Sequence, residues 1–275
     1  MKQKKKLLGI MAVMMIVLTG CQKQEVREVS SVTGKEILRI GMECDYAPYS
    51  TLTNRQTDTS VSIGDAGFCD GYDVMIARKV ADALHMEIQI TSLSWDALLP
   101  AIKENEIDAI IGGISATDER KKELDFTTPY YESEMVVIVR KEDEASKFTD
   151  IQQFKGKTIV GQANTTYDSG IEQMNGVIHA NAKTNYSQMV TALLAKEADA
   201  ILAELPVAQS VIKANSDLMY IQFEEGKGFD IDTSISIAMK KGSQKDELFQ
   251  KVQSALDGIS EKERQDMMAN ALSLY

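Results

Sequence analysis

Histidine is scarce in this sequence, and its scarcity argues against catalysis by a histidine acid or base. The chain has only two histidines, His85 and His179, and neither lies in a motif with a nucleophile or a metal ligand. There is also no Ser-His-Asp order, no cysteine and histidine cluster with metal-ligand spacing and no glycine-rich phosphate loop. The sequence therefore predicts a protein that is not an enzyme and that needs no metal ion or cofactor.

Basic residues are too few to balance the acidic ones. The 30 lysines and arginines stand against 41 aspartates and glutamates, which gives a formal net charge of -11. Removal of the first 20 residues, which hold four lysines and no acidic residue, would lower the net charge to -15. Because such a surface repels phosphate backbones and anionic lipid headgroups, we expect neither nucleic-acid binding nor membrane attachment through charge.

The apolar run near the start of the chain is too short for a membrane span and has the features of an export signal. Four lysines precede the stretch 7–18, whereas a membrane span needs about 20 apolar residues. The stretch ends Leu18-Thr19-Gly20-Cys21, which resembles the bacterial lipobox. This resemblance implies that residues 1–20 are a signal peptide, that Cys21 is lipidated, and that 21–35 tether the protein to the outer face of the cell membrane. A plain secretion signal with an incidental cysteine is the alternative.

Two further cysteines, Cys44 and Cys69, complete the small set of thiols. A location outside the cytoplasm permits a disulfide, and a bond between these two would close the loop that separates them. Two buried free thiols would fit the same sequence, because spacing alone does not bring two sulfur atoms together. Of the two alternatives, the disulfide is the one we favour.

Strand-like and helix-like segments alternate along the rest of the chain, which predicts an α/β fold with mostly parallel sheets flanked by helices. Residues 51–67 interrupt this pattern as an exposed loop or hairpin rich in Thr, Ser, Asp and Gly. Helices are expected from 71, after capping residues Ser94 and Ser187, and from 244. The expected strands are 37–40, 87–91, 108–111, 135–139, 158–161, 199–203 and 235–239.

Two halves of the chain repeat the same local order, which predicts two similar lobes. In each half a helix is followed by an Asp-Ala-Ile strand, at 108–110 and at 199–201. Both strands end in polar residues, and ligands in open α/β sheets bind beyond the carboxyl ends of the strands. We therefore expect a ligand cleft between the two lobes.

The clearest candidate binding element is the segment from Gly112 to Arg120. Its glycines allow the backbone to approach a ligand closely, and Thr117 is placed to cap the short helix that follows. Arg120 then lies in the first turn of that helix, where the helix dipole disfavours a cation. Because a planar guanidinium binds both oxygens of a carboxylate, we predict that Arg120 binds a carboxylate. A solvated arginine paired with a surface acid is the alternative.

Together these motifs resemble those of the extracellular solute-binding proteins (family 3) of polar amino-acid ABC transporters. The resemblance runs from Ile37 to the C-terminus and implies the type II periplasmic-binding-protein fold, with a ligand cleft between two lobes. Its most specific element is 113–122, Gly-Ile-Ser-Ala-Thr-Asp-Glu-Arg-Lys-Lys. The other matching segments, in order, are 41–49, 71–74, 95–102, 108–127, 161–167, 198–206 and 237–243.

The resemblance also implies how the chain divides between the lobes. One lobe would comprise residues 36–129 together with 236–275, and the other lobe would comprise residues 135–230. The chain would cross between them at 130–134 and at 231–235, which returns the last helices to the first lobe.

The resemblance implies that five residues of this chain contact the α-carboxylate and the α-ammonium of the ligand. Arg120 would bind the α-carboxylate of an amino acid, helped by Ser115 and by the turn that contains Thr165 and Thr166. The carbonyl of Gly113 and the hydroxyl of Ser115 would accept hydrogen bonds from the α-ammonium.

Four further positions follow from the same resemblance. Glu204 stands where the family usually has an aspartate that binds the α-ammonium, and it is longer by one methylene. Tyr46 and Tyr72 would stack on the side chain of the ligand. Glu43 lies where relatives carry an acid that faces the ligand.

These positions predict the capture of a free amino acid without chemical change. The surplus of acids over arginine at the site favours a cationic ligand, namely arginine, lysine or histidine, and glutamine or another polar neutral amino acid is the alternative. We expect a monomer that is anchored through Cys21 and that docks, closed, on the permease of an ABC importer. A secreted enzyme of the same fold, similar to cyclohexadienyl dehydratase, and a sensor module are the alternative functions.

Overall fold

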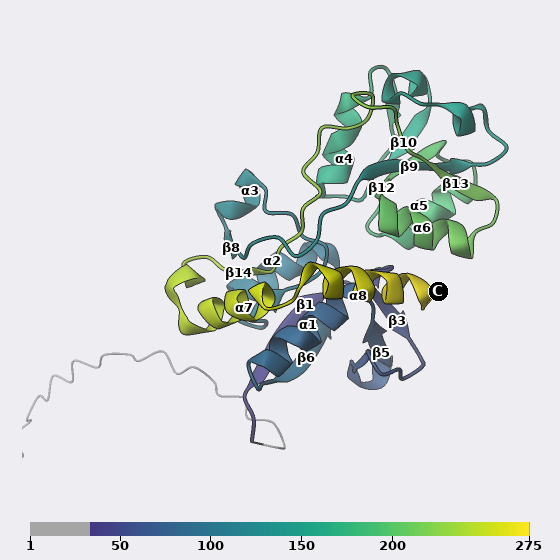
Figure 1. The fold of residues 1–275 in the computed structure, drawn as a ribbon. Helices are drawn as coiled ribbons and strands as arrows, with labels where there is room; N and C mark the ends of the chain where they lie inside the picture. The colour runs from purple at the N-terminus through teal and green to yellow at the C-terminus, as the bar shows by residue number, and fades with distance from the viewer. Residues whose placement is uncertain (1–33, 275) are drawn as a thin grey trace, which may run out of the picture.

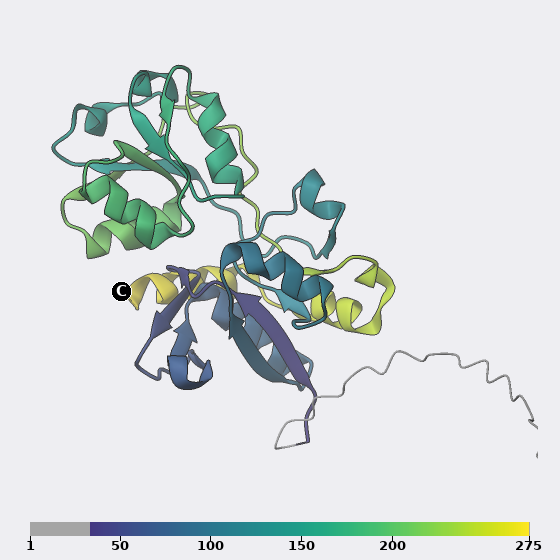
Figure 2. The ribbon, with the colours of Figure 1, turned by 180° about the vertical axis from the view of Figure 1, so that it is seen from behind.

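The computed structural model describes residues 34–274, which fold into two lobes joined by extended segments (Figure 1). Residue Cys21, the signal peptide and most of the tether lie outside the described residues. Each lobe has a five-stranded sheet with helices packed against it (Figure 2). The predicted two-lobe α/β fold is therefore confirmed, but the prediction of mostly parallel sheets is wrong, because each five-stranded sheet has two parallel and two antiparallel strand pairings.

The first lobe contains residues from both ends of the described chain. Its sheet consists of β1 (Ile37–Met42), β6 (Glu87–Ser92), β7 (Ala109–Ile110), β8 (Leu124–Phe126) and β14 (Ala238–Lys240). Strand β1 lies between β6 and β7 and runs parallel to both, whereas β14 runs antiparallel to its neighbours β7 and β8. The helices are α1 (Tyr72–Ala83), α2 (Trp95–Lys103), α3 (Asp118–Lys121), α7 (Glu247–Asp257) and α8 (Glu261–Ser273), with 3₁₀ turns η1 (Gly64–Ala66) and η5 (Ser243–Lys245).

The second lobe is formed by the middle of the chain. Its sheet consists of β9 (Met135–Arg140), β10 (Thr158–Val160), β11 (Ile178–His179), β12 (Ala200–Glu204) and β13 (Leu218–Ile221). The spatial order is β11-β10-β12-β9-β13, and every residue of β9 and β12 is buried. The helices are α4 (Thr166–Gly170), α5 (Tyr186–Leu194) and α6 (Leu205–Ala214), with 3₁₀ turns η2 (Glu144–Lys147), η3 (Ile151–Phe154) and η4 (Ile171–Gln173). Within 34–274, no helix combines the length and the apolar character that a membrane crossing requires.

A small antiparallel sheet extends the first lobe beyond the end of β1. It consists of β2 (Asp45–Tyr46), β3 (Ser50–Thr53), β5 (Phe68–Asp70) and β4 (Val61–Ser62), in that spatial order. The stretch 51–67, predicted as a loop or hairpin, thus supplies β4 and most of β3. Cys44 and Cys69 form a disulfide, with Cα atoms 5.9 Å apart, that joins the residue before β2 to the middle of β5.

The repeated Asp-Ala-Ile segments have the same structure in both lobes. Helices α2 and α5 are each followed by a residue with positive φ, Asn105 at 59° and Lys196 at 64°, which turns the chain back toward the sheet. Asp108 then accepts a hydrogen bond of 2.9 Å from a backbone amide of β1, and Asp199 accepts one of 2.8 Å from β10. The two aspartates thus fix equivalent strands in register, which explains why the sequence repeats.

Of two predicted helix caps, Thr117 and Ser187, the structure shows only the first. The hydroxyl of Thr117 accepts from the backbone amide of Arg120, so this cap is confirmed. The cap predicted at Ser187 is wrong, because Asn185 is in the capping position and its side chain accepts from the amide of Gln188. Ser187 lies inside the first turn of α5, where its hydroxyl instead donates to Asp45 of the first lobe at 2.8 Å.

The two segments that join the lobes lie side by side. Tyr131 and Ile235 form an antiparallel bridge, and the hydroxyl of Thr233 donates to the carbonyl of Ser133 at 2.5 Å. Strand pairing at this point holds the two segments together, so a rotation of one lobe against the other would bend both at once.

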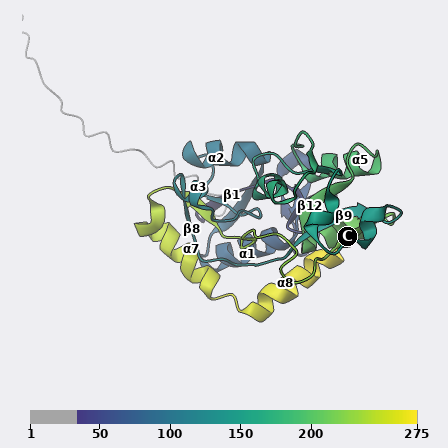
Figure 3. The ribbon, with the colours of Figure 1, turned by 90° about the horizontal axis from the view of Figure 1, so that it is seen from above.

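The C-terminal helix α8 contacts both lobes, and Figure 3 shows it following α7 along one side of the molecule. Toward its start, Glu263 forms an ion pair of 3.1 Å with Lys79 of α1. Toward its end, the carbonyl of Leu272 accepts a hydrogen bond of 3.0 Å from Lys213 of α6 in the second lobe.

Candidate functional site

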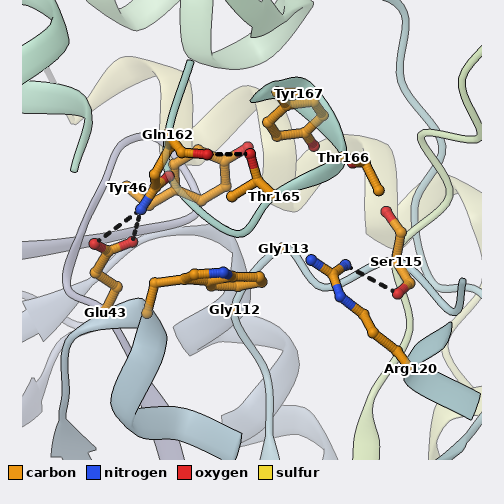
Figure 4. Close-up of a pocket in the computed structure, with 11 residues that line it drawn as sticks. Glu43, Tyr46, Gly112, Gly113, Ser115, Arg120, Gln162, Thr165, Thr166 and Tyr167 are labelled. Atoms are coloured by element: carbon orange, nitrogen blue, oxygen red, sulfur yellow. Dashed lines mark hydrogen bonds between the residues drawn. The ribbon is translucent and has the colours of Figure 1, made fainter. Parts of the chain in front are cut away.

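A narrow hollow lies between the two lobes, where the carboxyl ends of their strands face each other (Figure 4). The first lobe contributes the end of β1, the start of α2 and the turn between β7 and α3. The second lobe contributes the turn between β10 and α4. The lining residues are Glu43, Tyr46, Trp95, Gly112, Gly113, Ser115, Arg120, Gln162, Thr165, Thr166 and Tyr167.

The turn after β7 brings the backbone to the surface of the hollow. Gly113 has a φ of 64°, a conformation that side chains disfavour. A Cβ at this position would lie 2.6 Å from a ring carbon of Tyr46. Only glycine therefore allows the aromatic ring of Tyr46 to pack directly on this turn, and both residues contribute to the same wall.

Arg120 supplies the positive charge of the site. Its guanidinium donates to the carbonyl of Ser115 at 3.2 Å and to that of Asn164 at 3.5 Å, and it lies 5.0 Å from the ring centre of Trp95. None of the acidic side chains in 34–274 forms an ion pair with it, and burial lowers the pKa of the guanidinium. Burial of a cation without a counterion costs about several kcal/mol of free energy. This position therefore favours the binding of an anion.

Glu43 supplies a negative charge on the opposite side of the hollow from Arg120 (Figure 4). Both of its carboxylate oxygens lie 3.2 Å from the side-chain amide of Gln162, which donates to them from the second lobe. Burial raises the pKa of Glu43 to about 7, the hydrogen bond from Gln162 opposes this rise, and the charges of Asp45 and Asp96 add to it. The site therefore presents a cation at one end and a titratable acid at the other.

The second lobe faces these groups with hydroxyls. Thr165 is the capping residue of α4: its hydroxyl accepts from the amide of Asp168 and donates to the carbonyl of Gln162 at 2.7 Å. Thr166 is the first residue of α4 and lines the hollow beside Thr165. Both threonines therefore lie where the resemblance placed them, across the hollow from the first lobe.

Seven of the nine predicted contact residues line the hollow, whereas Tyr72 and Glu204 do not. Tyr72 is fully buried in the first lobe, where its hydroxyl donates to the carbonyl of Tyr130 at 3.2 Å. Glu204 is also fully buried, and the hydroxyls of Tyr46 and Tyr49 donate to its carboxylate, each at 2.7 Å. In this structure neither residue has a surface on the hollow, so the predicted direct contacts of Tyr72 and Glu204 with a ligand gain no support from the geometry.

Three lining residues had no predicted role at the site, namely Trp95, Gln162 and Tyr167, and Gly112 was expected there only as a glycine of the binding turn. Gln162 and Tyr167 belong to the polar turn that follows a buried strand, and this position is the signal that could have identified them. Trp95 is the first residue of α2, and its side chain reaches across the lobes to donate to the carbonyl of Asn164 at 3.1 Å. That contact depends on the second lobe, so the local sequence does not reveal it.

Comparison with known proteins identifies relatives along almost the whole chain. The family model of the bacterial extracellular solute-binding proteins, family 3, matches residues 38–271. The arginine-binding extracellular protein ArtP of Bacillus subtilis is 25% identical over 260 residues, which cover 94% of each chain. A probable histidine-binding protein of Campylobacter jejuni is 29% identical over 241 residues, covering 85% of this chain and 86% of that protein.

Solved structures show the same similarity. The crystal structure of the amino-acid ABC transporter substrate-binding protein AbpA from Streptococcus pneumoniae, bound to L-arginine, superposes with a TM-score of 0.73. It is 25% identical in sequence, and the match covers 86% of this chain and 94% of that one.

Proposed function

The chain belongs to the bacterial extracellular solute-binding proteins of family 3, and from this premise we propose that it captures a free basic amino acid between its lobes. The observation that carries the proposal is Arg120, a partly buried guanidinium on the wall of an inter-lobe hollow with no carboxylate partner among residues 34–274. The α-carboxylate of an amino acid is an anion of the right size and geometry to pair with it. Ser115 and Thr166 would donate to the same carboxylate, and Thr165 would join them once its hydroxyl turns away from the carbonyl of Gln162.

A basic side chain is favoured by the other end of the hollow. Glu43 is the acid that lines the hollow opposite Arg120, and a cationic group there would compensate its partly buried charge. The amide of Gln162, already bonded to Glu43, could also bind a polar neutral side chain, which keeps glutamine as the alternative ligand. The relatives described as arginine-binding and histidine-binding proteins support the basic ligand.

The captured amino acid would be delivered for transport into the cell. The lobes would rotate about the paired crossover segments, close over the ligand and dock on the permease of an ABC importer. We propose that Cys21 anchors the protein, as a monomer, to the outer face of the cell membrane, and that the ligand is released unchanged.

Titration calorimetry against the twenty amino acids would test the proposed ligand class. We expect arginine, lysine or histidine to bind most tightly and aspartate and glutamate not to bind, because Glu43 repels an acidic side chain. Tight binding of acidic amino acids alone would contradict the charge argument. Turnover of prephenate or arogenate by the purified protein would contradict the transport function.

Binding of arginine should strengthen as the pH rises from 6 to 8. Because the pKa of Glu43 is about 7, this carboxyl group is mostly protonated at pH 6 in the absence of ligand. Binding of arginine must then release the proton. For a site that binds only when ionised, the dissociation constant should fall by about tenfold between pH 6 and pH 8. Calorimetry in buffers of different ionisation enthalpy would also detect the released proton.

The variant Glu43→Gln provides the control for this pH dependence. It keeps the size of the side chain and a hydrogen-bonding group but removes the titration, so arginine binding should be weaker and nearly independent of pH. A wild-type affinity that does not change between pH 6 and pH 8, or a variant with an unaltered pH profile, would exclude Glu43 as the group that faces the ligand's charge.

A further inference from the structure

Glu204 is the centre of a buried hydrogen-bonded cluster that joins the two lobes. It ends β12 and has no exposed surface. The hydroxyl of Tyr46 donates to one carboxylate oxygen at 2.7 Å, and that of Tyr49 donates to the other at 2.7 Å. Tyr167 also donates to the oxygen that Tyr46 contacts. Two of these phenols belong to the first lobe and one to the second, so a single carboxylate holds groups from both.

The cluster satisfies the carboxylate without a cation. No lysine or arginine within 34–274 forms an ion pair with Glu204, and the three side chains that donate to its carboxylate are all tyrosines. Burial raises the pKa of Glu204, while the hydrogen bonds from the three phenols oppose the rise. A phenol that donates its only hydrogen to a carboxylate keeps lone pairs on its oxygen, and the negative partner makes that oxygen a better acceptor.

Two of the three tyrosines belong to the lining of the ligand site. Tyr46 and Tyr167 line the hollow, whereas Tyr49 and Glu204 do not. Tyr46 packs directly on Gly113, the turn residue expected to face the ammonium of a bound amino acid. An α-ammonium is attached to the same carbon as the carboxylate that Arg120 would bind, so it must lie close to this wall.

We propose that Tyr46 and Tyr167 recognise the α-ammonium of the ligand through their hydroxyl oxygens, and that Glu204 acts behind them as a positioning residue. The two phenol oxygens would accept N–H groups from the ammonium while their own hydrogens remain directed to the carboxylate. Glu204 would orient both phenols and stabilise the cation without touching it. This inference rests on the proposed function, because it requires an amino acid in the hollow.

The arrangement predicts strong selection for ligands that carry an α-amino group. An analogue without that group would leave two buried phenol oxygens facing the hollow with no donor, and sites built around such hydrogen bonds reject analogues that lack them. The measurable quantity is the ratio between the dissociation constants of the analogue and of the amino acid. For arginine the matched analogue is 5-guanidinopentanoate, which keeps the carboxylate and the guanidinium.

The decisive experiment measures this ratio by calorimetry in wild type and in single tyrosine variants. We expect a wild-type ratio of about 100 or more, and a ratio lowered by about tenfold in Tyr46→Phe and in Tyr167→Phe. Tyr49→Phe is the matched control, since it removes a phenol hydroxyl from the same carboxylate but lies outside the hollow, and it should leave the ratio unchanged. Glu204→Gln should lower the ratio, because it removes the charge that orients the phenols.

The affinity for 5-guanidinopentanoate shows whether each variant still folds and binds the carboxylate, so it should be similar in all five proteins. Unchanged ratios in both Tyr46→Phe and Tyr167→Phe would overturn the proposal. A ratio lowered only in Glu204→Gln would overturn it too, because it would indicate direct contact between Glu204 and the ammonium. If wild type binds arginine and its analogue equally, ammonium recognition is absent and this inference fails alone. If wild type binds no amino acid at all, the proposed function fails with it.

Discussion

Replacement of Arg120 by alanine is expected to weaken amino-acid binding by about thirtyfold or more. The guanidinium has only carbonyl and aromatic neighbours among residues 34–274, so its removal leaves a bound carboxylate without a cationic partner. Truncation of one member of a buried, hydrogen-bonded charge pair typically costs about 2–5 kcal/mol of binding free energy. Calorimetry with the tightest-binding amino acid would measure the change.

Two further variants make this measurement specific. Lys121→Ala removes the neighbouring cation, which is exposed and forms a 3.7 Å ion pair with Asp118, and it should leave binding unchanged. Arg120→Lys keeps the charge but loses the planar fork, so we expect an affinity between those of wild type and the alanine variant. Full-strength binding by Arg120→Ala would remove the basis of the proposed function.

Loss of the disulfide is expected to lower the free energy of unfolding by about 3 kcal/mol. The bond joins residues separated by 25 positions and links the residue before β2 to β5, so its removal frees a long loop in the unfolded chain. Urea denaturation of wild type and of the double variant Cys44→Ala/Cys69→Ala would measure the difference. Wild type with a reducing agent should behave like the variant.

The Cys44–Cys69 disulfide should also affect the affinity for the ligand. Cys44 lies between Glu43 and Tyr46, two residues that line the hollow, and it has a positive φ of 52°. Without the bond this segment is less restrained, so we expect the double variant to bind its amino acid more weakly as well as to unfold more easily. Equal stability of the oxidised protein and the variant would show that the bond contributes little to either property.

The sequence is most informative where function is encoded within a few consecutive residues. Gly113 and the capping Thr117 lie between β7 and α3, and Arg120 lies within α3, so the turn geometry and the candidate carboxylate-binding group could be predicted together. The same holds for the Asp-Ala-Ile repeat, since a helix end, an aspartate and a strand lie next to one another in each lobe.

Residues whose role depends on the other lobe were harder to predict. The role of Glu204 is set by Tyr46 and Tyr49, which lie more than 150 positions earlier in the chain. Ser187 was expected to cap its own helix, yet its hydroxyl bonds to Asp45 of the first lobe. In such cases several local interactions are comparable in energy, and the tertiary contact decides between them.

The C-terminal helix α8 would resist an opening of the lobes, although none of its side chains lines the hollow. It is tied to α1 through Glu263 and to α6 through the carbonyl of Leu272, on opposite sides of the division between the lobes. Any outward swing of the second lobe must therefore stretch or release the contact with Lys213. We therefore expect the balance between open and closed molecules to depend partly on this surface, which is remote from the hollow, so that changes in sequence there would alter the affinity for the ligand and leave the selectivity intact.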